Sequence, residues 1–143
     1  MEWMLMPYRR YADFKGRSRR KEYWMFVLFT IIVGVVLGGI TMAGLPLSSM
    51  SDPALAETAS IGPLGYLGMI LLGLFWLASI IPSFAVTVRR FHDQDKTGWF
   101  VLMSFIPYIG GLIILVFMLL KGTEGPNRYG PDPKDPHAAG VFE

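Results

Sequence analysis

An apolar run that begins at Tyr23 follows directly on a dense block of cationic residues. Roughly 20 apolar residues are enough for a helix to cross the hydrocarbon core of a bilayer, and clustered Arg and Lys mark the cytoplasmic end of such a helix. The block consists of seven residues: Arg9, Arg10, Lys15, Arg17, Arg19, Arg20 and Lys21. The sequence therefore predicts a membrane-spanning helix with a cytoplasmic N-terminal end, from which the later segments can be oriented.

The rest of the chain is also unusually poor in charge. Charged residues make up 17% of the sequence, whereas soluble proteins contain about 25%, and these charges gather at a few points. The 143 residues suffice for one compact unit. We expect an all-α membrane protein, a small bundle of three transmembrane helices with an interfacial amphipathic N-terminal helix. The expected parts are a basic segment 1–21, a membrane domain 22–121 with spans at about 22–44, 61–88 and 99–120, and a Gly/Pro-rich tail 122–143.

The first 14 residues alternate large apolar side chains with charged ones. This partly amphipathic pattern favours a short helix lying in the headgroup layer, although a disordered basic tail is the alternative. Pro7 must lie near the start of such a helix or kink it, and Gly16 separates it from the first span.

The two loops between spans differ in charge. The loop 45–60 contains Asp52 and Glu57 but no Lys or Arg, whereas the loop 89–99 contains three basic residues. Because positive loops stay in the cytoplasm, we place the first loop outside and the second inside.

The third apolar segment leaves two topologies open. Pro107 and the pair Gly110-Gly111 interrupt it. We expect three full spans, with the tail outside. In the alternative, the segment turns back on itself as a re-entrant hairpin whose arms, about nine residues each, are too short to cross. The tail then joins the basic segments in the cytoplasm.

Small and hydroxylated residues predict how the helices pack. Gly34 and Gly38 form a Gly-x-x-x-Gly pair that lets another helix approach closely. Ser79, Ser83 and Thr87 recur every four residues and so share one helix face, where their hydroxyls bond helix carbonyls or a neighbouring helix. Pro82 is a predicted kink in the second span.

Few residues suggest catalysis or metal binding. His92, Asp93 and Asp95 are candidate ligands of a divalent metal. The pattern Asp93-x-Asp95-x-Thr97-Gly98 resembles the first half of a calcium loop, but the twelfth position of that loop is Ser104 rather than the required Glu. We expect instead a charged turn in which Asp93 caps a helix or pairs with Arg89 or Arg90. No strand–turn–helix elbow surrounds a serine, and the sequence has no cysteine. We therefore predict no enzyme, cofactor or metal, and no nucleic acid as a partner, because the basic residues form no extended face.

Glu22 stands at the membrane edge where the second span ends. We expect it to form an ion pair with one of the two arginines there, and we assign Arg90 as its partner. The other basic residues are predicted to contact lipid headgroups or a partner: Arg9, Arg10, Arg17, Arg19, Arg20, Lys21, Arg89 and Arg90.

Three segments, at residues 14–26, 89–99 and 122–133, together resemble the DUF805 family of small bacterial inner-membrane proteins of unknown function. They read Phe-Lys-Gly-Arg-Ser-Arg-Arg-Lys-Glu-Tyr-Trp-Met-Phe, Arg-Arg-Phe-His-Asp-Gln-Asp-Lys-Thr-Gly-Trp and Gly-Thr-Glu-Gly-Pro-Asn-Arg-Tyr-Gly-Pro-Asp-Pro. Their order and spacing match as well. The resemblance implies a multi-pass protein of the bacterial inner membrane and no catalytic residues.

These patterns lead to two functional hypotheses. The first is a non-catalytic integral membrane protein that binds anionic lipid, and a partner protein or copies of itself, through a basic cytoplasmic surface. The second is a channel or transporter subunit that uses the Ser79, Ser83 and Thr87 face and a re-entrant third segment. No charged residue lies at the middle of a predicted span, which disfavours an ion-coupled carrier because such carriers usually have an ionisable residue there.

Overall fold

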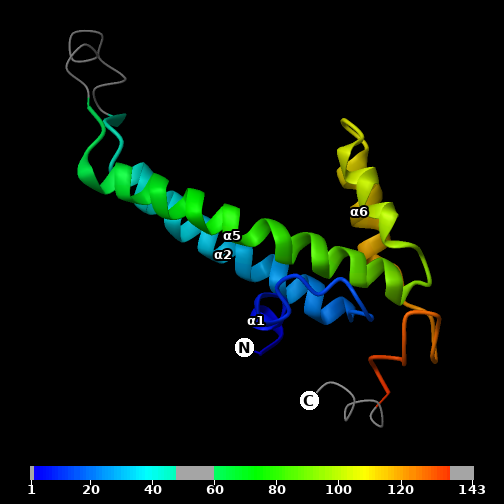
Figure 1. Cartoon of the computed structure of the whole chain (residues 1–143). Helices are drawn as coiled ribbons and strands as arrows, with labels where there is room; N and C mark the ends of the chain where they lie inside the picture. Colours follow the sequence, from blue (N-terminus) through cyan, green and yellow to red (C-terminus); the bar gives the residue numbers. More distant parts are fainter. Residues whose placement is uncertain (1, 48–59, 136–143) are drawn as a thin grey trace. The chain divides into compact units, whose positions relative to one another are not determined.

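The computed structural model describes residues 2–47 and 60–135, and every described helix is α or 3₁₀. In chain order these are α1 (Glu2–Arg9), α2 (Arg20–Ala43), α5 (Pro63–Asp93), η1 (Gly98–Phe105) and α6 (Gly110–Leu119) (Figure 1). Residues 48–59, which form most of the predicted first loop, and 136–143, at the end of the predicted tail, lie outside the described residues. The all-α prediction is confirmed for the part of the chain that is described.

The two long helices have the length and composition of membrane spans. α2 has 24 residues and α5 has 31, and both are strongly apolar. Only 6% of the most apolar window of α2 is buried within the protein, and 22% of that of α5. Because the core helix of a soluble protein would be mostly buried, these exposed apolar surfaces fit a lipid environment. Pro63 occupies the first position of α5, where a proline costs no hydrogen bond, and α5 continues past Pro82.

The described chain divides into two compact units, one of residues 29–79 and the other of the residues before and after them. Within unit 29–79, the end of α2 and the start of α5 lie side by side and antiparallel (Figure 1). Phe29 and Phe75 pack edge to face with ring centroids 6.3 Å apart. A Cβ on Gly68 would lie 2.7 Å from the Cα of Thr41, so the helices touch here through backbone.

The close approach in this unit does not use the predicted glycine pair. A Cβ on Gly34 would make an ordinary contact with Trp76 at 3.9 Å, and one on Gly38 would meet nothing within 4 Å. Gly38 therefore takes no part in the packing of α2 on α5 within this chain. The glycines that a Cβ would drive into neighbouring backbone are Gly44, Gly65 and Gly68, because the helices converge toward their connecting end.

The third apolar segment is a hairpin and not a continuous span. η1 and α6 lie against each other (Figure 1, yellow to orange), and the chain reverses at Tyr108, which has a left-handed φ of 65°. A Cβ on Gly110 would overlap the carbonyl of Met103, so glycine allows the tight return. A ten-residue α-helix rises about 15 Å, half of the roughly 30 Å that a span must cover. The prediction of a third span at 99–120 is thus wrong, and the hairpin alternative describes the segment.

Candidate functional site

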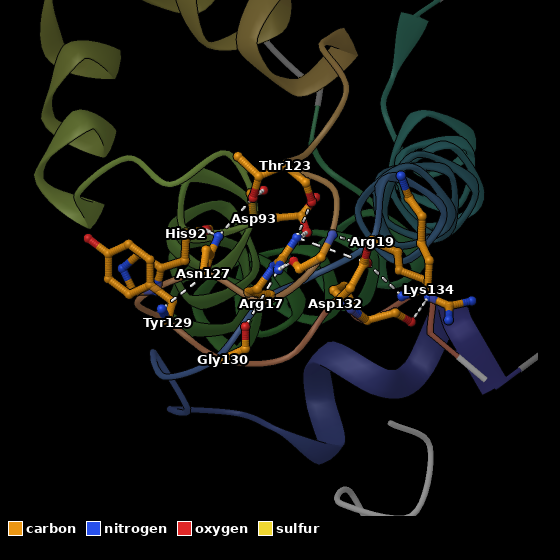
Figure 2. A network of polar contacts seen from close by, with 12 residues as sticks. Arg17, Arg19, His92, Asp93, Thr123, Asn127, Tyr129, Gly130, Asp132 and Lys134 are labelled. Carbon is orange, nitrogen blue, oxygen red and sulfur yellow. Dashed lines mark hydrogen bonds and ion pairs between the residues drawn. The ribbon is translucent and has the colours of Figure 1, made fainter. Parts of the chain in front are cut away.

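Arg17 lies at the centre of a polar cluster that joins three distant stretches of the chain (Figure 2). Its side chain is 1% exposed. The Nε atom donates to Asp93 Oδ1 at 3.0 Å, and the two terminal nitrogens donate to the carbonyls of Gly125 and Thr123 at 2.6 Å each. Asp132 lies 4.0 Å away. The loop after α6 therefore wraps a buried guanidinium that precedes α2, and it supplies carbonyl acceptors in place of water.

Asp93, at the end of α5, is shared by two buried arginines. Its Oδ1 accepts from Arg17, and its Oδ2 accepts from Arg90 one turn earlier on the same helix. The side chain is 2% exposed. Its backbone carbonyl accepts both the N–H and the hydroxyl of Thr123. The expected pairing of Asp93 with Arg89 or Arg90 is confirmed, with Arg90 as the partner.

Arg89 fixes the start of α2 to the end of α5. Its Nη2 donates to Glu22 Oε1 at 2.8 Å, and both side chains are almost completely buried. Its other terminal nitrogen donates to the backbone carbonyl of Asp13, and its own carbonyl accepts the N–H of Ser18 at 3.1 Å. Glu22 thus pairs with one of the two expected arginines, but the assignment to Arg90 is wrong, because Asp93 already holds Arg90.

The loop after α6 has a defined local structure of its own. Asn127 and Gly130 form an antiparallel backbone bridge, and the Asn127 amide donates to the carbonyl of His92 at 2.9 Å. The rings of His92 and Tyr129 are stacked, with centroids 3.8 Å apart and planes 4° from parallel (Figure 2). His92 also lies 3.2 Å, through Nδ1, from the carbonyl of Gly16. These contacts bind the loop to both of the other stretches.

Polar side chains also complete the end of α6. The last carbonyls of a helix have no partner within it. Here the carbonyl of Phe117 accepts from Gln94, that of Leu119 from Arg20 at 3.1 Å, and that of Leu120 from Arg90. Positive charge is also favourable at this end of a helix. Because Gln94 and Arg90 precede the hairpin in the chain, their bonds to the end of α6 hold the two ends of the hairpin close together.

Two carboxylates on the periphery have lowered pKa values. Burial alone would raise the pKa of Asp132, but hydrogen bonds from the N–H groups of Lys134 and Gly125, and the charge of Arg17, outweigh it. For Asp13 the raising effect of burial is likewise outweighed by Arg10, whose Nε donates at 2.8 Å, and by the N–H of Lys15. Both groups therefore stabilise the fold in their ionised form.

Comparison with known proteins bears on the same segments. Residues 11–131 match the family model described as "Protein of unknown function (DUF805)". The chain is also 42% identical to inner membrane protein YhaI of Escherichia coli over 94% of its length and 97% of that relative. It is 41% identical to inner membrane protein YhaH of the same organism, over 94% and 98%. The chain belongs to the DUF805 family. No solved structure matches it significantly.

The buried cluster contains residues from all three of the segments that first suggested DUF805. Arg17 and Glu22 come from the first, Arg89 and Asp93 from the second, and the carbonyls around Arg17 from the third. Since these residues form hydrogen bonds and ion pairs with one another inside the fold, the three segments together build a buried polar core in this DUF805 protein.

Burial corrects the list of predicted headgroup contacts. Arg17, Arg89 and Arg90 are 3%, 0% and 0% exposed, so they are not available to lipid or a partner. Arg10 is paired with Asp13 at 2.6 Å, and Arg19 is half-buried and donates to the carbonyl of Pro133. The predicted contacts that keep exposed side chains are Arg9, Arg20 and Lys21.

Hydroxyls of the predicted Ser/Thr face bond back to carbonyls of their own helix. Ser79 donates to the carbonyl of Phe75 at 2.6 Å, and Thr87 donates to that of Ser83 at 2.7 Å, as expected of hydroxyls in a membrane helix. Ser83 and Thr87 line a shallow groove of about 170 Å³ together with Ser104 of the hairpin. Ser79 is not part of this groove.

Sequence reasoning missed the role of the loop 122–133. Its Gly and Pro residues correctly predicted turns, but they gave no sign that its carbonyls bind Arg17. A Cβ on Gly122 would overlap the Asp93 carboxylate, so this glycine is needed for a close approach. The only sequence signal was that the loop matched the family together with the two basic segments.

Proposed function

We propose that this protein is a non-catalytic component of the bacterial inner membrane that binds anionic lipid headgroups, and a partner protein or a second copy, through a basic cytoplasmic surface. The names of YhaI and YhaH support the location, and the two long apolar helices support a multi-pass arrangement. The density of basic residues before α2 favours a cytoplasmic N-terminus.

One observation carries the proposal. After internal partners have neutralised the buried arginines, Arg9, Lys15, Arg20 and Lys21 still have exposed side chains. Arg20 and Lys21 belong to the first turn of an apolar 24-residue helix, and Arg9 and Lys15 precede it in the chain. A membrane surface containing anionic lipid attracts such residues by about 1 kcal/mol each. The exposed cations therefore favour anionic lipid at this end of the protein.

Lipid selectivity tests the proposal. Purified protein in detergent is titrated with phosphatidylglycerol or phosphatidylcholine, and bound lipid is counted by native mass spectrometry. We expect a preference for phosphatidylglycerol that weakens as salt is raised, since screening reduces the attraction between exposed charges. Equal binding of the two lipids would contradict the proposal.

The bonds between Arg17 and the loop after α6 favour a topology in which residue 17 and residues 123–125 lie on one side of the membrane. The chain has no cysteine, so Lys15→Cys and Lys134→Cys each introduce a unique label site at an exposed position. A membrane-impermeant maleimide is expected to leave both unlabelled in intact spheroplasts and to label both after lysis. Labelling of one site but not the other in intact cells would refute this arrangement.

A further inference from the structure

A groove between the first turns of α2 and the end of α6 has mainly apolar walls and includes two cationic residues in its lining. Its volume is about 330 Å³, and it is lined by Arg20, Lys21, Trp24, Met25 and Leu119. This size lies at the lower end of the range of ligand pockets, about 300–1,000 Å³. The groove lies entirely within the unit that contains the polar cluster, at the edge of the first apolar helix.

The two cations at its rim are held in place. Arg20 donates through Nη1 to the carbonyl of Leu119 at 3.1 Å, so its guanidinium spans from α2 to α6 and has further N–H donors for another acceptor. The Lys21 ammonium lies 5.6 Å from the centre of the Trp3 ring, a cation–π distance. Both side chains remain exposed.

Charge and polarity together specify one kind of occupant. Two cations at one rim match an anionic phosphate, whereas Trp24, Met25 and Leu119 offer apolar surface for a hydrocarbon chain. A tryptophan beside cations at the end of a spanning helix is typical of the membrane interface. A soluble anion would use only the cationic rim, and a neutral lipid only the apolar walls.

We propose that this groove is a specific site for one anionic phospholipid, with its phosphate on Arg20 and Lys21 and an acyl chain against Trp24, Met25 and Leu119. This inference rests on the proposed function and adds to it a defined site. In this site Arg20 and Lys21 bind the lipid directly. Arg9 and Lys15 contribute only to the positive electrostatic potential of the basic surface.

Two double variants with the same loss of charge test the site. Arg20→Gln with Lys21→Gln removes the rim, and Arg9→Gln with Lys15→Gln removes exposed charge that does not line the groove. A cation that contacts the phosphate of a bound lipid contributes about fivefold to binding, whereas Arg9 and Lys15 do not line the groove. We therefore expect the ratio of bound phosphatidylglycerol to phosphatidylcholine to fall about 25-fold in the first variant and much less in the second. Arg20→Lys with Lys21→Arg, which keeps the charge, should retain most of the preference.

The acyl chain is tested separately through Trp24. In a Trp3→Phe, Trp76→Phe, Trp99→Phe background, phosphatidylglycerol with brominated acyl chains is expected to quench the remaining fluorescence more than brominated phosphatidylcholine. Removing the rim charges should abolish this difference. Circular dichroism establishes that each variant keeps its helix content.

The possible results separate the two proposals. If the two double variants lose lipid preference equally, the basic surface attracts lipid but the groove is not a site, and this inference is overturned. If the unaltered protein has no preference for the anionic lipid, the proposed function fails as well. Preference lost with the rim alone, together with loss of selective quenching, supports the site.

Discussion

Changing Asp93 to Asn removes one negative charge from the polar cluster and keeps the size of the side chain. In the folded protein both carboxylate oxygens accept from buried guanidinium groups, one from Arg17 at 3.0 Å and the other from Arg90. An asparagine turns one of these acceptors into an NH₂ group that faces a donor. Two cations that are at most 1% exposed then lose their shared anionic partner.

The magnitude follows from the cost of leaving a buried charge without a partner. Removing one member of a buried ion pair destabilises proteins by about 3–5 kcal/mol. We expect Asp93→Asn to lower the free energy of unfolding by an amount in this range. Thr123 remains bonded to the backbone carbonyl of residue 93, so part of the attachment of the loop is preserved, and a value toward the lower end is reasonable.

A matched control lies two residues along the chain. Asp95 pairs with Arg128 at 3.1 Å, but the two side chains are 47% and 59% exposed. Exposed pairs contribute about 0–1 kcal/mol. Asparagine also tolerates the left-handed backbone that Asp95 adopts, with φ 55°. Asp95→Asn should therefore cost at most about 1 kcal/mol while making the same chemical change.

Unfolding in mixed detergent micelles, followed by circular dichroism, measures both variants, and limited trypsin digestion reports on the loop after α6. We expect Asp93→Asn to unfold at a clearly lower denaturant fraction and to be cut faster at Arg128. If the two variants unfold together with the unaltered protein, the cluster does not stabilise the fold in the way we describe.

Three further changes test other parts of the structure. Glu22→Arg should destabilise the protein strongly, and adding Arg89→Glu should restore much of the loss in an unfolding assay, whereas the same exchange at the neighbouring arginine should not. Gly68→Ala should weaken the packing of α2 on α5 and lower the unfolding midpoint. Gly38→Ala places its methyl group in open space and should leave the midpoint unchanged or raised. Equal effects of the two variants on the midpoint would refute this packing. Asp132 has a folded pKa below its ordinary value of 3.8, so its ionised form stabilises the fold above pH 3.8. This stabilisation is lost as the pH falls through the folded pKa. The difference in unfolding free energy between the unaltered protein and Asp132→Asn should therefore shrink to zero as the pH is lowered.

The sequence predicted the features that depend on local pattern. Long apolar runs beside basic residues predicted the ends of both long helices to within a few residues. The length of an apolar run and the basic residues that flank it can be read from adjacent positions in the sequence. The hydroxyls of Ser79 and Thr87 return to their own helix, as the four-residue spacing predicted. The helix at residues 2–9 was also expected.

Features that depend on distant residues were predicted less well. The seven cations of the N-terminal basic block are alike in sequence, yet Arg17 is buried against the loop after α6 and Arg9 is exposed. Nothing local separates them, since the acceptors of Arg17 are the Asp93 carboxylate, 76 positions away, and two backbone carbonyls more than 100 positions away. Backbone carbonyls leave no trace in residue identity. The assignment of Arg90 as the partner of Glu22 was wrong because Asp93, three residues along the same helix, binds Arg90.

The hairpin and the polar cluster depend on each other. An apolar segment that enters the membrane and returns must end with its last carbonyls near a source of donors, because lipid supplies none. Gln94, Arg20 and Arg90 supply them at the end of α6. Arg90 in turn requires Asp93, which also binds Arg17, and Arg17 holds the loop that follows the hairpin. A continuous third span would carry that loop to the opposite face of the membrane and leave Arg17 buried without its carbonyls. The short arms of the third apolar segment are therefore tied to the cluster: the segment turns back because both of its ends are held at the same polar site.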